Sequence, residues 1–172
     1  MLTAEQRTVV AGIAAACAFS VAFVVAALRL VPIDPPAVAT QADRVAFALR
    51  CDFWAALALL AGVGRVANQR FFSNEIDGSV APRARALEVN RAYLQNTTEQ
   101  LLLLVFAHLG LALALDAASL RVIPILVALF LIGRATFWAG YLRSPPARAF
   151  GFATTFYPTV AAMLWAALRL AR

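Results

Sequence analysis

The chain has 172 residues, of which 63% are hydrophobic and only 14% are charged, and its mean hydropathy is +0.79. These values lie outside the range of ordinary soluble domains and indicate an integral membrane protein. The length allows four or five membrane-spanning helices of about 20 residues each, joined by short loops, and leaves no room for a separate soluble domain.

The formal net charge is +6, and all fifteen basic residues are arginine. Because these arginines lie mainly at the ends of apolar segments or inside them, they indicate membrane topology and anion binding, and they argue against nucleic acid as a partner. Cys17 and Cys51 lie in apolar segments, where we expect neither a disulfide nor a metal site. No Cys/His ligand spacing occurs, so metal catalysis has no support.

Five apolar segments are expected to span the membrane as helices. The breaks between them fall at the prolines at 32, 35 and 36, in the polar segment 68–88, at a short turn before residue 120, and at the sequence "RSPPAR". The polar segment includes turn residues at Asp77-Gly78 and a proline at 82. The predicted spans are 8–28, 44–66, 84–114, 120–143 and 149–170.

An odd number of spans places the two termini on opposite sides of the membrane. The positive-inside rule assigns the more arginine-rich side to the cytoplasm. The first side holds arginines 7, 65, 70, 83, 85, 143 and 148, and the other side holds arginines 29, 44, 121, 169 and 172. We therefore expect a cytoplasmic N-terminus and an external C-terminus.

Polar and charged residues inside the third and fourth spans are candidate functional residues, because an ionisable group in a membrane is costly unless it is paired or hydrated. The first cluster is Arg91, Gln95, Asn96 and Glu99, and the second is Arg134, Tyr141, Arg143 and Arg148. Glu99 lies about 12 Å below Arg91, and Arg134 lies about 10 Å below Tyr141, so a Glu99–Arg134 ion pair is expected. Such a pair could be purely structural, but a polar crevice between the two helices would also suit a charged, peptide-like ligand.

Two helical spacings refine this picture. Arg134, Phe137 and Tyr141 recur at i, i+3 and i+7, so they share one face of the fourth span. A third cluster joins Arg50 and Asp52 of the second span to His108, the one histidine of the chain. We interpret His108 as a hydrogen-bonded structural residue, with a metal or proton-relay role as the less favoured alternative.

Two stretches resemble the MAPEG family, the membrane-associated proteins in eicosanoid and glutathione metabolism. "RAYLQNTTEQ" is similar to the Arg, Asn-x-x-Glu signature of the family, and "GRATFWAGYLRSPPARAFGF" is similar to the end of its last-but-one helix, in the pattern common among bacterial members. The resemblance covers residues 42 to 170. It implies a four-helix protomer, here within an all-α integral membrane protein, that assembles as a homotrimer.

The resemblance implies a role for six residues. Arg91, Asn96, Glu99, Arg134 and Tyr141 would bind glutathione between adjacent subunits, and Arg148 would lie beside its sulfur. A guanidinium cannot act as a base at neutral pH, but it lowers the pKa of a neighbouring thiol by its opposite charge. Glutathione would be the co-substrate, and a lipophilic substrate would enter from the membrane lipid.

Three features depart from the family pattern. Arg91 and Asn96 are five residues apart instead of four. Either a π-bulge accommodates the extra residue, or Arg91 does not bind the ligand. Phe137 stands where the family often has a ligand-binding tyrosine. The span at 8–28 precedes the four of the family, so residues 1–36 are expected to form an extra, peripheral N-terminal helix with its proline loop, and residues 37–172 the MAPEG-like domain.

Two functions follow from these residues. The first is a membrane-bound glutathione S-transferase or peroxidase that acts on a lipophilic electrophile, in the inner membrane of a bacterium and with its glutathione site facing the cytoplasm. The alternative is a non-catalytic lipid-binding or scaffold member of the family. A transporter or channel finds little support, because the chain has no inverted repeat and no discontinuous helices.

Overall fold

The computed structural model describes residues 2–32, 37–73, 75–78 and 82–172. Five long helices, each long and apolar enough to cross a membrane, make up most of the chain, and no strand occurs in these ranges. This confirms the prediction of an all-α membrane protein with five spans. The helices are α1 (Ala4–Leu30), α2 (Gln41–Phe71), α3 (Arg85–Ala114), α4 (Val122–Arg143) and α5 (Ala149–Leu170), and the 3-10 turns η1 (Ala118–Arg121) and η2 (Pro146–Arg148) precede α4 and α5.

Two of the helices are longer than their hydropathy predicts. At the start of α1, the Thr3 side chain accepts a hydrogen bond from the Gln6 backbone, and the Gln6 side chain accepts one from the Thr3 backbone. This reciprocal cap begins the helix before the apolar run. At the end of α2, Asn90 of α3 donates to the Gln69 side chain at 2.6 Å. The helix therefore continues to Phe71 through residues that are too polar to register as a span.

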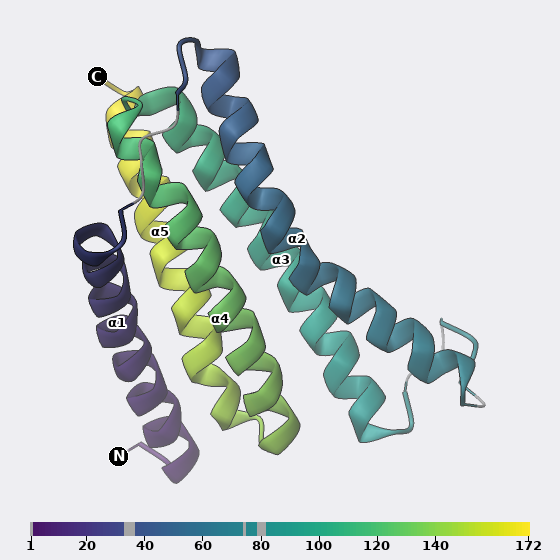
Figure 1. The fold of residues 1–172 in the computed structure, drawn as a ribbon. Helices are drawn as coiled ribbons and strands as arrows, with labels where there is room; N and C mark the ends of the chain where they lie inside the picture. Colours follow the sequence, from purple (N-terminus) through teal and green to yellow (C-terminus); the bar gives the residue numbers. More distant parts are fainter. Residues whose placement is uncertain (1, 33–36, 74, 79–81) are drawn as a thin grey trace.

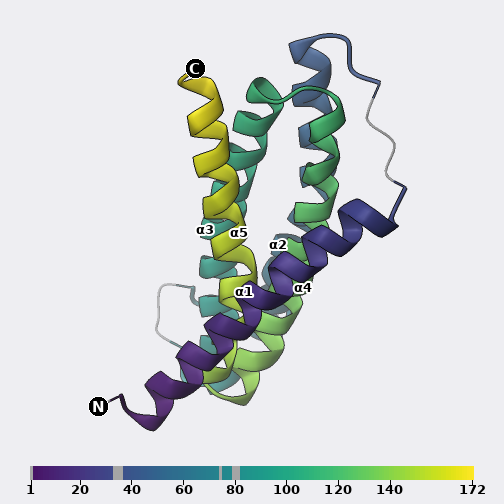
Figure 2. The same cartoon turned by 90° about the vertical axis from the view of Figure 1, so that its left-hand side faces the viewer.

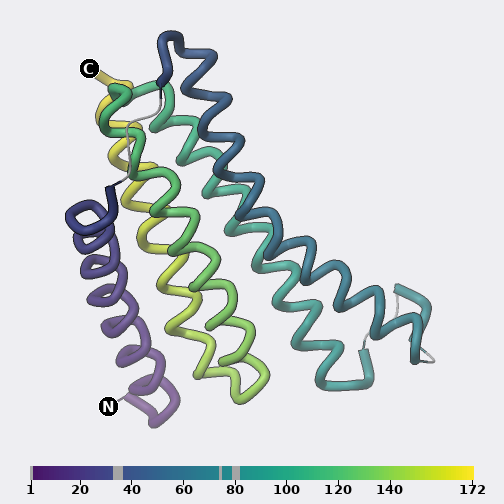
Figure 3. Tube along the Cα trace, in the orientation of Figure 1, coloured from purple at the N-terminus to yellow at the C-terminus, as the bar shows by residue number. Residues whose placement is uncertain are grey.

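Successive helices run in opposite directions, so the N-terminus and the C-terminus lie at opposite ends of the bundle, as the odd number of spans predicts (Figure 1). The N-terminal end is also the end at which α3 begins and η2 joins α4 to α5. The α2–α3 pair leans away from α5 and α4 toward this same end (Figure 3). The helices separate at this end, so the side chains between them are candidates for a functional site.

Helix α1 lies on the outside of the bundle and crosses α5 and α4 obliquely (Figure 2). Only Ala16 and Ser20 of this helix are buried. At the crossing, a Cβ atom added to Gly12 would lie 3.3 Å from Ala149 Cβ, so the two helices approach closely. The division of the chain at residue 36 falls outside the described residues, and the independence of the first 36 residues stays a prediction.

Helices α4 and α5 touch backbone to backbone. A Cβ atom on Gly151 of α5 would lie 2.1 Å from the backbone nitrogen of Phe137 and 2.6 Å from the carbonyl oxygen of Gly133, both in α4. No side chain can occupy that space, and neither obstacle can rotate away. The two helices are therefore held as one unit, which places Gly151 and Thr155 of α5 beside Arg134 of α4.

Helices α2 and α3 are joined by buried polar contacts. His108 Nδ1 lies 2.5 Å from Asp52 Oδ1, and both side chains are almost fully buried. The Tyr93 hydroxyl donates to the carbonyl oxygen of Ala58 at 3.1 Å. The interpretation of His108 as a hydrogen-bonded core residue is confirmed, whereas Arg50, which was grouped with it, is exposed at the protein surface.

Candidate functional site

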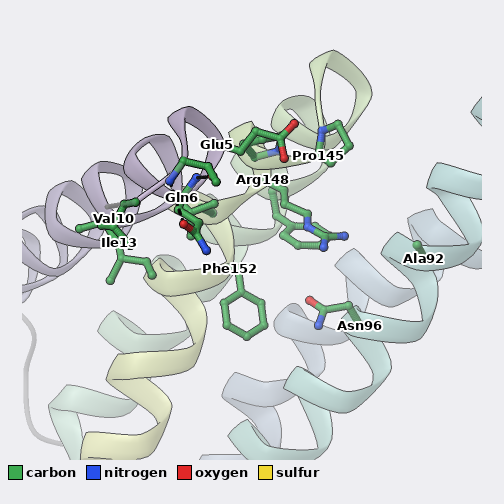
Figure 4. Close-up of a pocket in the computed structure, with 15 residues that line it drawn as sticks. Glu5, Gln6, Val10, Ile13, Ala92, Asn96, Pro145, Arg148 and Phe152 are labelled. Carbon is green, nitrogen blue, oxygen red and sulfur yellow. Dashed lines mark hydrogen bonds between the residues drawn. The ribbon is translucent and has the colours of Figure 1, made fainter.

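A cavity of about 810 Å³ opens at the N-terminal end of the bundle (Figure 4). It lies between the first turns of α1, the first half of α3, the end of α4 and the start of α5, and we call it the α1/α3 cavity. Its polar lining includes Glu5 and Gln6 from α1, Asn96 from α3 and Arg148 from η2. Phe152 of α5 is among its apolar lining residues, so the cavity joins polar and apolar surfaces.

Arg134 lies behind one wall of the α1/α3 cavity and is 1% exposed. Its Nη1 donates to Asn96 Oδ1 at 2.8 Å, and its Nη2 contacts Thr155 Oγ1 and the carbonyl oxygen of Gly151. The guanidinium also lies 4.7 Å from the ring centre of Phe137, within the range of a cation–π interaction. Arg134 therefore fixes the Asn96 amide in the cavity wall and does not itself reach the cavity.

The expected ion pair between Glu99 and Arg134 is wrong. Glu99 accepts a hydrogen bond from the Gln95 side chain at 2.8 Å, and its side chain is exposed. Asn96 and Glu99 are three residues apart, so on a regular helix they point about 60° apart. Asn96 takes the position that faces Arg134, and Glu99 is turned outward. In the described part of the chain no carboxylate lies within salt-bridge distance of Arg134.

Arg148 lines the cavity and packs against Tyr141, which is not itself a lining residue. The guanidinium carbon of Arg148 lies 4.4 Å from the ring centre of Tyr141, and the Tyr141 ring packs edge-on against Phe137 at 5.7 Å. Arg148 is the last residue of the short turn η2, which begins at Pro146, the second of the two prolines after α4. The predicted shared face of Arg134, Phe137 and Tyr141 is confirmed, and Arg148 extends that row of stacked groups into the cavity.

Arg91 does not join these residues. Helix α3 is α-helical throughout, without the π-bulge that would have turned Arg91 toward Asn96. Ala92, four residues before Asn96, lines the cavity in the position expected for an arginine. Arg91 instead lines a separate hollow with Glu88 and Gln95 on the outer side of α3. The grouping of Arg91 with Asn96 and Arg134 in one crevice is therefore wrong, because five residues correspond to about 140° of rotation.

An aromatic stack holds α3 against α4 at this level. The rings of Tyr93 and Trp138 are parallel, with centres 4.4 Å apart, and Trp138 Nε1 donates to Asn90 Oδ1 at 2.6 Å. The Phe137 ring lies 6.2 Å from that of Tyr93. These contacts set the rotation of α3 and therefore decide that Asn96, and not Glu99, faces Arg134.

Comparison with known proteins gives the family. The model of the MAPEG family matches residues 49–168, well over half of the chain. The chain belongs to the MAPEG family. The match in this MAPEG protein includes all of α3 and α4 and nearly all of α5, and so every residue to which the sequence assigned a ligand role. Helix α1 precedes it.

Two curated relatives are mammalian. The MAPEG chain is 27% identical to Transmembrane protein 79 of Mus musculus and 26% identical to that of Bos taurus, each over 161 residues. These matches cover 94% of this chain but only 41% and 40% of the relatives, so the chain spans about two fifths of their length. At most 11 residues of this chain lie outside each match, so most of α1 lies within the matched segment. No solved structure matches the chain.

Several residues of the candidate site could not be found from the sequence. Glu5 and Gln6 line the α1/α3 cavity, although their helix was expected only to be an extra, peripheral one. Thr155, which contacts Arg134, is one of three buried threonines in α5, and its neighbours Thr154 and Thr159 do not contact Arg134 through any hydrogen bond in the described part of the chain. The polar pair at positions 5 and 6 was visible in the sequence, but a polar residue before an apolar run equally indicates a helix start.

Proposed function

We propose that the protein binds an amphiphilic anion in the α1/α3 cavity and acts as a lipid-binding member of its family. The observation that carries this proposal is one arginine in the lining of a cavity that also has apolar walls, with a second arginine buried behind that lining. Arg148 lines the cavity and Arg134 lies directly behind Asn96. The family membership and the five spans support a ligand that comes from the membrane lipid.

The charge distribution explains why the ligand would be an anion. A buried guanidinium without a carboxylate partner is only partly compensated by the Asn96 oxygen, the Thr155 hydroxyl and the Phe137 ring. Its remaining positive potential acts on the neighbouring cavity, where the low dielectric of a membrane protein strengthens it. Arg148 adds a second positive charge that a ligand can contact directly. Phe152 and the aliphatic side chains of α1 would contact the apolar part of the ligand.

The experiment is a calorimetric titration of the detergent-purified protein with lysophosphatidic acid. We expect saturable binding that weakens by about tenfold or more in Arg148→Ala, because a charge-assisted contact is lost. Arg143→Ala is the matched control, since Arg143 is exposed on the same side of the membrane and does not line the cavity. Absence of saturable binding, or equal losses in both variants, would refute the proposal.

A second candidate function is glutathione-dependent transfer or peroxide reduction, and the position of Arg148 favours it. A glutathione sulfur beside this guanidinium would have a lowered pKa and would attack a lipophilic electrophile as the thiolate. Arg148 would act by charge alone, and Asn96 and Tyr141 would contact the peptide. Thiolate absorbance during a glutathione titration tests this function: we expect it in the native protein and its loss in Arg148→Ala. An unchanged spectrum in the native protein would leave lipid binding alone.

Assembly as a homotrimer is part of the proposal. Gln95, Thr98 and Glu99 are exposed along one face of α3, inside a helix that is apolar enough to span the membrane. An ionisable side chain against lipid is costly, so we expect another copy of the chain to cover this face. Native mass spectrometry in mild detergent measures the stoichiometry. A monomer at all protein concentrations would contradict this assembly.

The proposed location is the inner membrane of a bacterium, with the N-terminus and the α1/α3 cavity facing the cytoplasm. The arginine bias between the two ends of the bundle supports this orientation. Cysteine accessibility from each side of sealed membranes, with single cysteines placed at Arg7 and Arg172 in a variant that lacks Cys17 and Cys51, would measure it. Labelling of position 172 from the cytoplasmic side would reverse the assignment.

A further inference from the structure

Helix α1 supplies about a third of the lining residues of the α1/α3 cavity, and Leu2 and Thr3, just before the helix, also line it. This helix lies before the segment that matches the family model, so the cavity is built partly from residues that the four family helices do not provide. The contribution of α1 is not uniform. Glu5 and Gln6 lie in its first turns, and Val10 and Ile13 follow one to two turns further on.

The cavity carries one charge of each sign. Glu5 and Arg148 both line it, and Figure 4 shows them on different elements around the same hollow. Their charged atoms are not within salt-bridge distance of each other, and in the described part of the chain neither side chain has a hydrogen bond or an ion pair. The Arg148 guanidinium lies over the ring of Tyr141. Two opposite charges that share a cavity without pairing can both be used by one ligand that carries the complementary charges.

The apolar lining residues indicate how that ligand would be oriented in the cavity. Helix α1 leads away from the end where Glu5 lies toward Val10 and Ile13, and Phe152 of α5 faces the same space. Figure 4 shows Glu5 and Arg148 near the turn that joins α4 to α5, and Phe152 farther from this turn, at about the level of Asn96. A lipid in a bilayer has the same arrangement, with its head group at the surface and its chain inside.

We propose that the α1/α3 cavity selects a zwitterionic amphiphile, in which an ammonium group and an anionic group are joined to an apolar chain. Glu5 accepts hydrogen bonds from the ammonium, and Arg148 binds the anion. Glu5 is thereby the specificity-determining residue, and α1 is a wall of the binding site. This inference rests on the proposed amphiphile binding. Two kinds of molecule carry the required chemistry: an ethanolamine phospholipid, and a peptide conjugate such as an S-alkyl glutathione.

The test compares three probes on the full-length protein in detergent. Lysophosphatidylethanolamine and lysophosphatidic acid have equal chain lengths, and S-hexylglutathione is the third probe. We expect the native protein to prefer the ethanolamine lipid by about tenfold, since a hydrogen bond between charged groups is added. Glu5→Gln should abolish that preference without weakening lysophosphatidic acid. Glu88→Gln is the matched control, because Glu88 is also an exposed glutamate in the first turn of a helix that begins at the same end, and it does not line the cavity.

The outcomes separate this inference from the proposed function. If lysophosphatidic acid does not bind the native protein, the proposed function fails. If it binds but neither lysophosphatidylethanolamine nor S-hexylglutathione is preferred to it, or if Glu5→Gln keeps the preference, the inference on Glu5 is overturned and anion binding stands. A Glu5-dependent preference for either zwitterion supports the inference, and the preferred probe identifies the source of the ligand.

Discussion

The buried pair between Asp52 and His108 permits a quantitative prediction of stability. Oδ1 of Asp52 and Nδ1 of His108 are 2.5 Å apart, whereas Oδ2 and Nε2 have no partner in the described part of the chain. Asp52→Leu would therefore leave both ring nitrogens of His108 buried and unpaired. A hydrogen bond between transmembrane helices contributes about 0.6 kcal/mol on average. Breaking a buried titratable pair on one side costs about 3–5 kcal/mol.

The exposed fractions decide between these two magnitudes. Asp52 is 5% exposed and His108 is 0% exposed, so neither can turn to water when its partner is removed. We expect Asp52→Leu to lower the free energy of unfolding by about 3 kcal/mol, near the cost of an uncompensated group. The double variant Asp52→Leu/His108→Leu replaces both partners with apolar groups and should recover most of this loss. Equilibrium unfolding in mixed detergent micelles measures both variants, with circular dichroism as the signal.

The double-mutant cycle also contains the result that would refute this reasoning. If the single variants each lose only about 0.6 kcal/mol and the double variant loses about as much as either of them, the pair is an ordinary interhelical contact and no uncompensated buried group is left behind. An unchanged slope of the unfolding free energy against denaturant would show that the comparison concerns the same folded and unfolded states.

Three further predictions concern other parts of the bundle. Gly151→Ala should destabilise the fold by about 1–3 kcal/mol or more, because the new methyl group would collide with the backbone of Phe137, and thermal unfolding would show it. The Ser119 backbone N–H donates a hydrogen bond to the Asp116 carboxylate and lowers the pKa of Asp116. The stability that this contact contributes is therefore present above the ordinary aspartate pKa and is lost as the pH falls through the lowered value. Acid-induced unfolding of the Asp116→Asn variant should lack this component. Deletion of residues 1–36 should leave a folded oligomer by size-exclusion chromatography but one that no longer binds lysophosphatidylethanolamine.

The sequence was sufficient for the features that depend on spacing along one helix. Apolar runs located all five spans, since a helix that crosses a membrane needs a continuous apolar segment of fixed length. The row formed by Arg134, Phe137 and Tyr141 followed from the i, i+3, i+7 repeat, and the structure stacks these side chains as expected. Both features are local, so they need no knowledge of where another helix lies.

The sequence was insufficient where two helices must be placed relative to each other. Depth along the membrane was estimated well enough to bring α3 opposite α4, but the rotation of α3 about its axis was not. That rotation depends on the Tyr93–Trp138 stack and the Asn90–Trp138 hydrogen bond, which join residues 45 or more positions apart. An error of about 60° in this rotation, the angle between residues three positions apart, exchanged Asn96 for Glu99 as the partner of Arg134. The place of α1 beside the cavity depends likewise on a crossing that no sequence period encodes.

The backbone contact between α4 and α5 has a consequence for how a ligand could reach the cavity. Gly133 and Gly151 leave no space between these two helices, so they cannot slide or separate without breaking the packing that orients Arg134. Helix α1, in contrast, buries only Ala16 and Ser20. The least costly route for the apolar chain of a lipid is therefore lateral, from the surrounding leaflet and past α1, while its head group stays at the open end of the cavity.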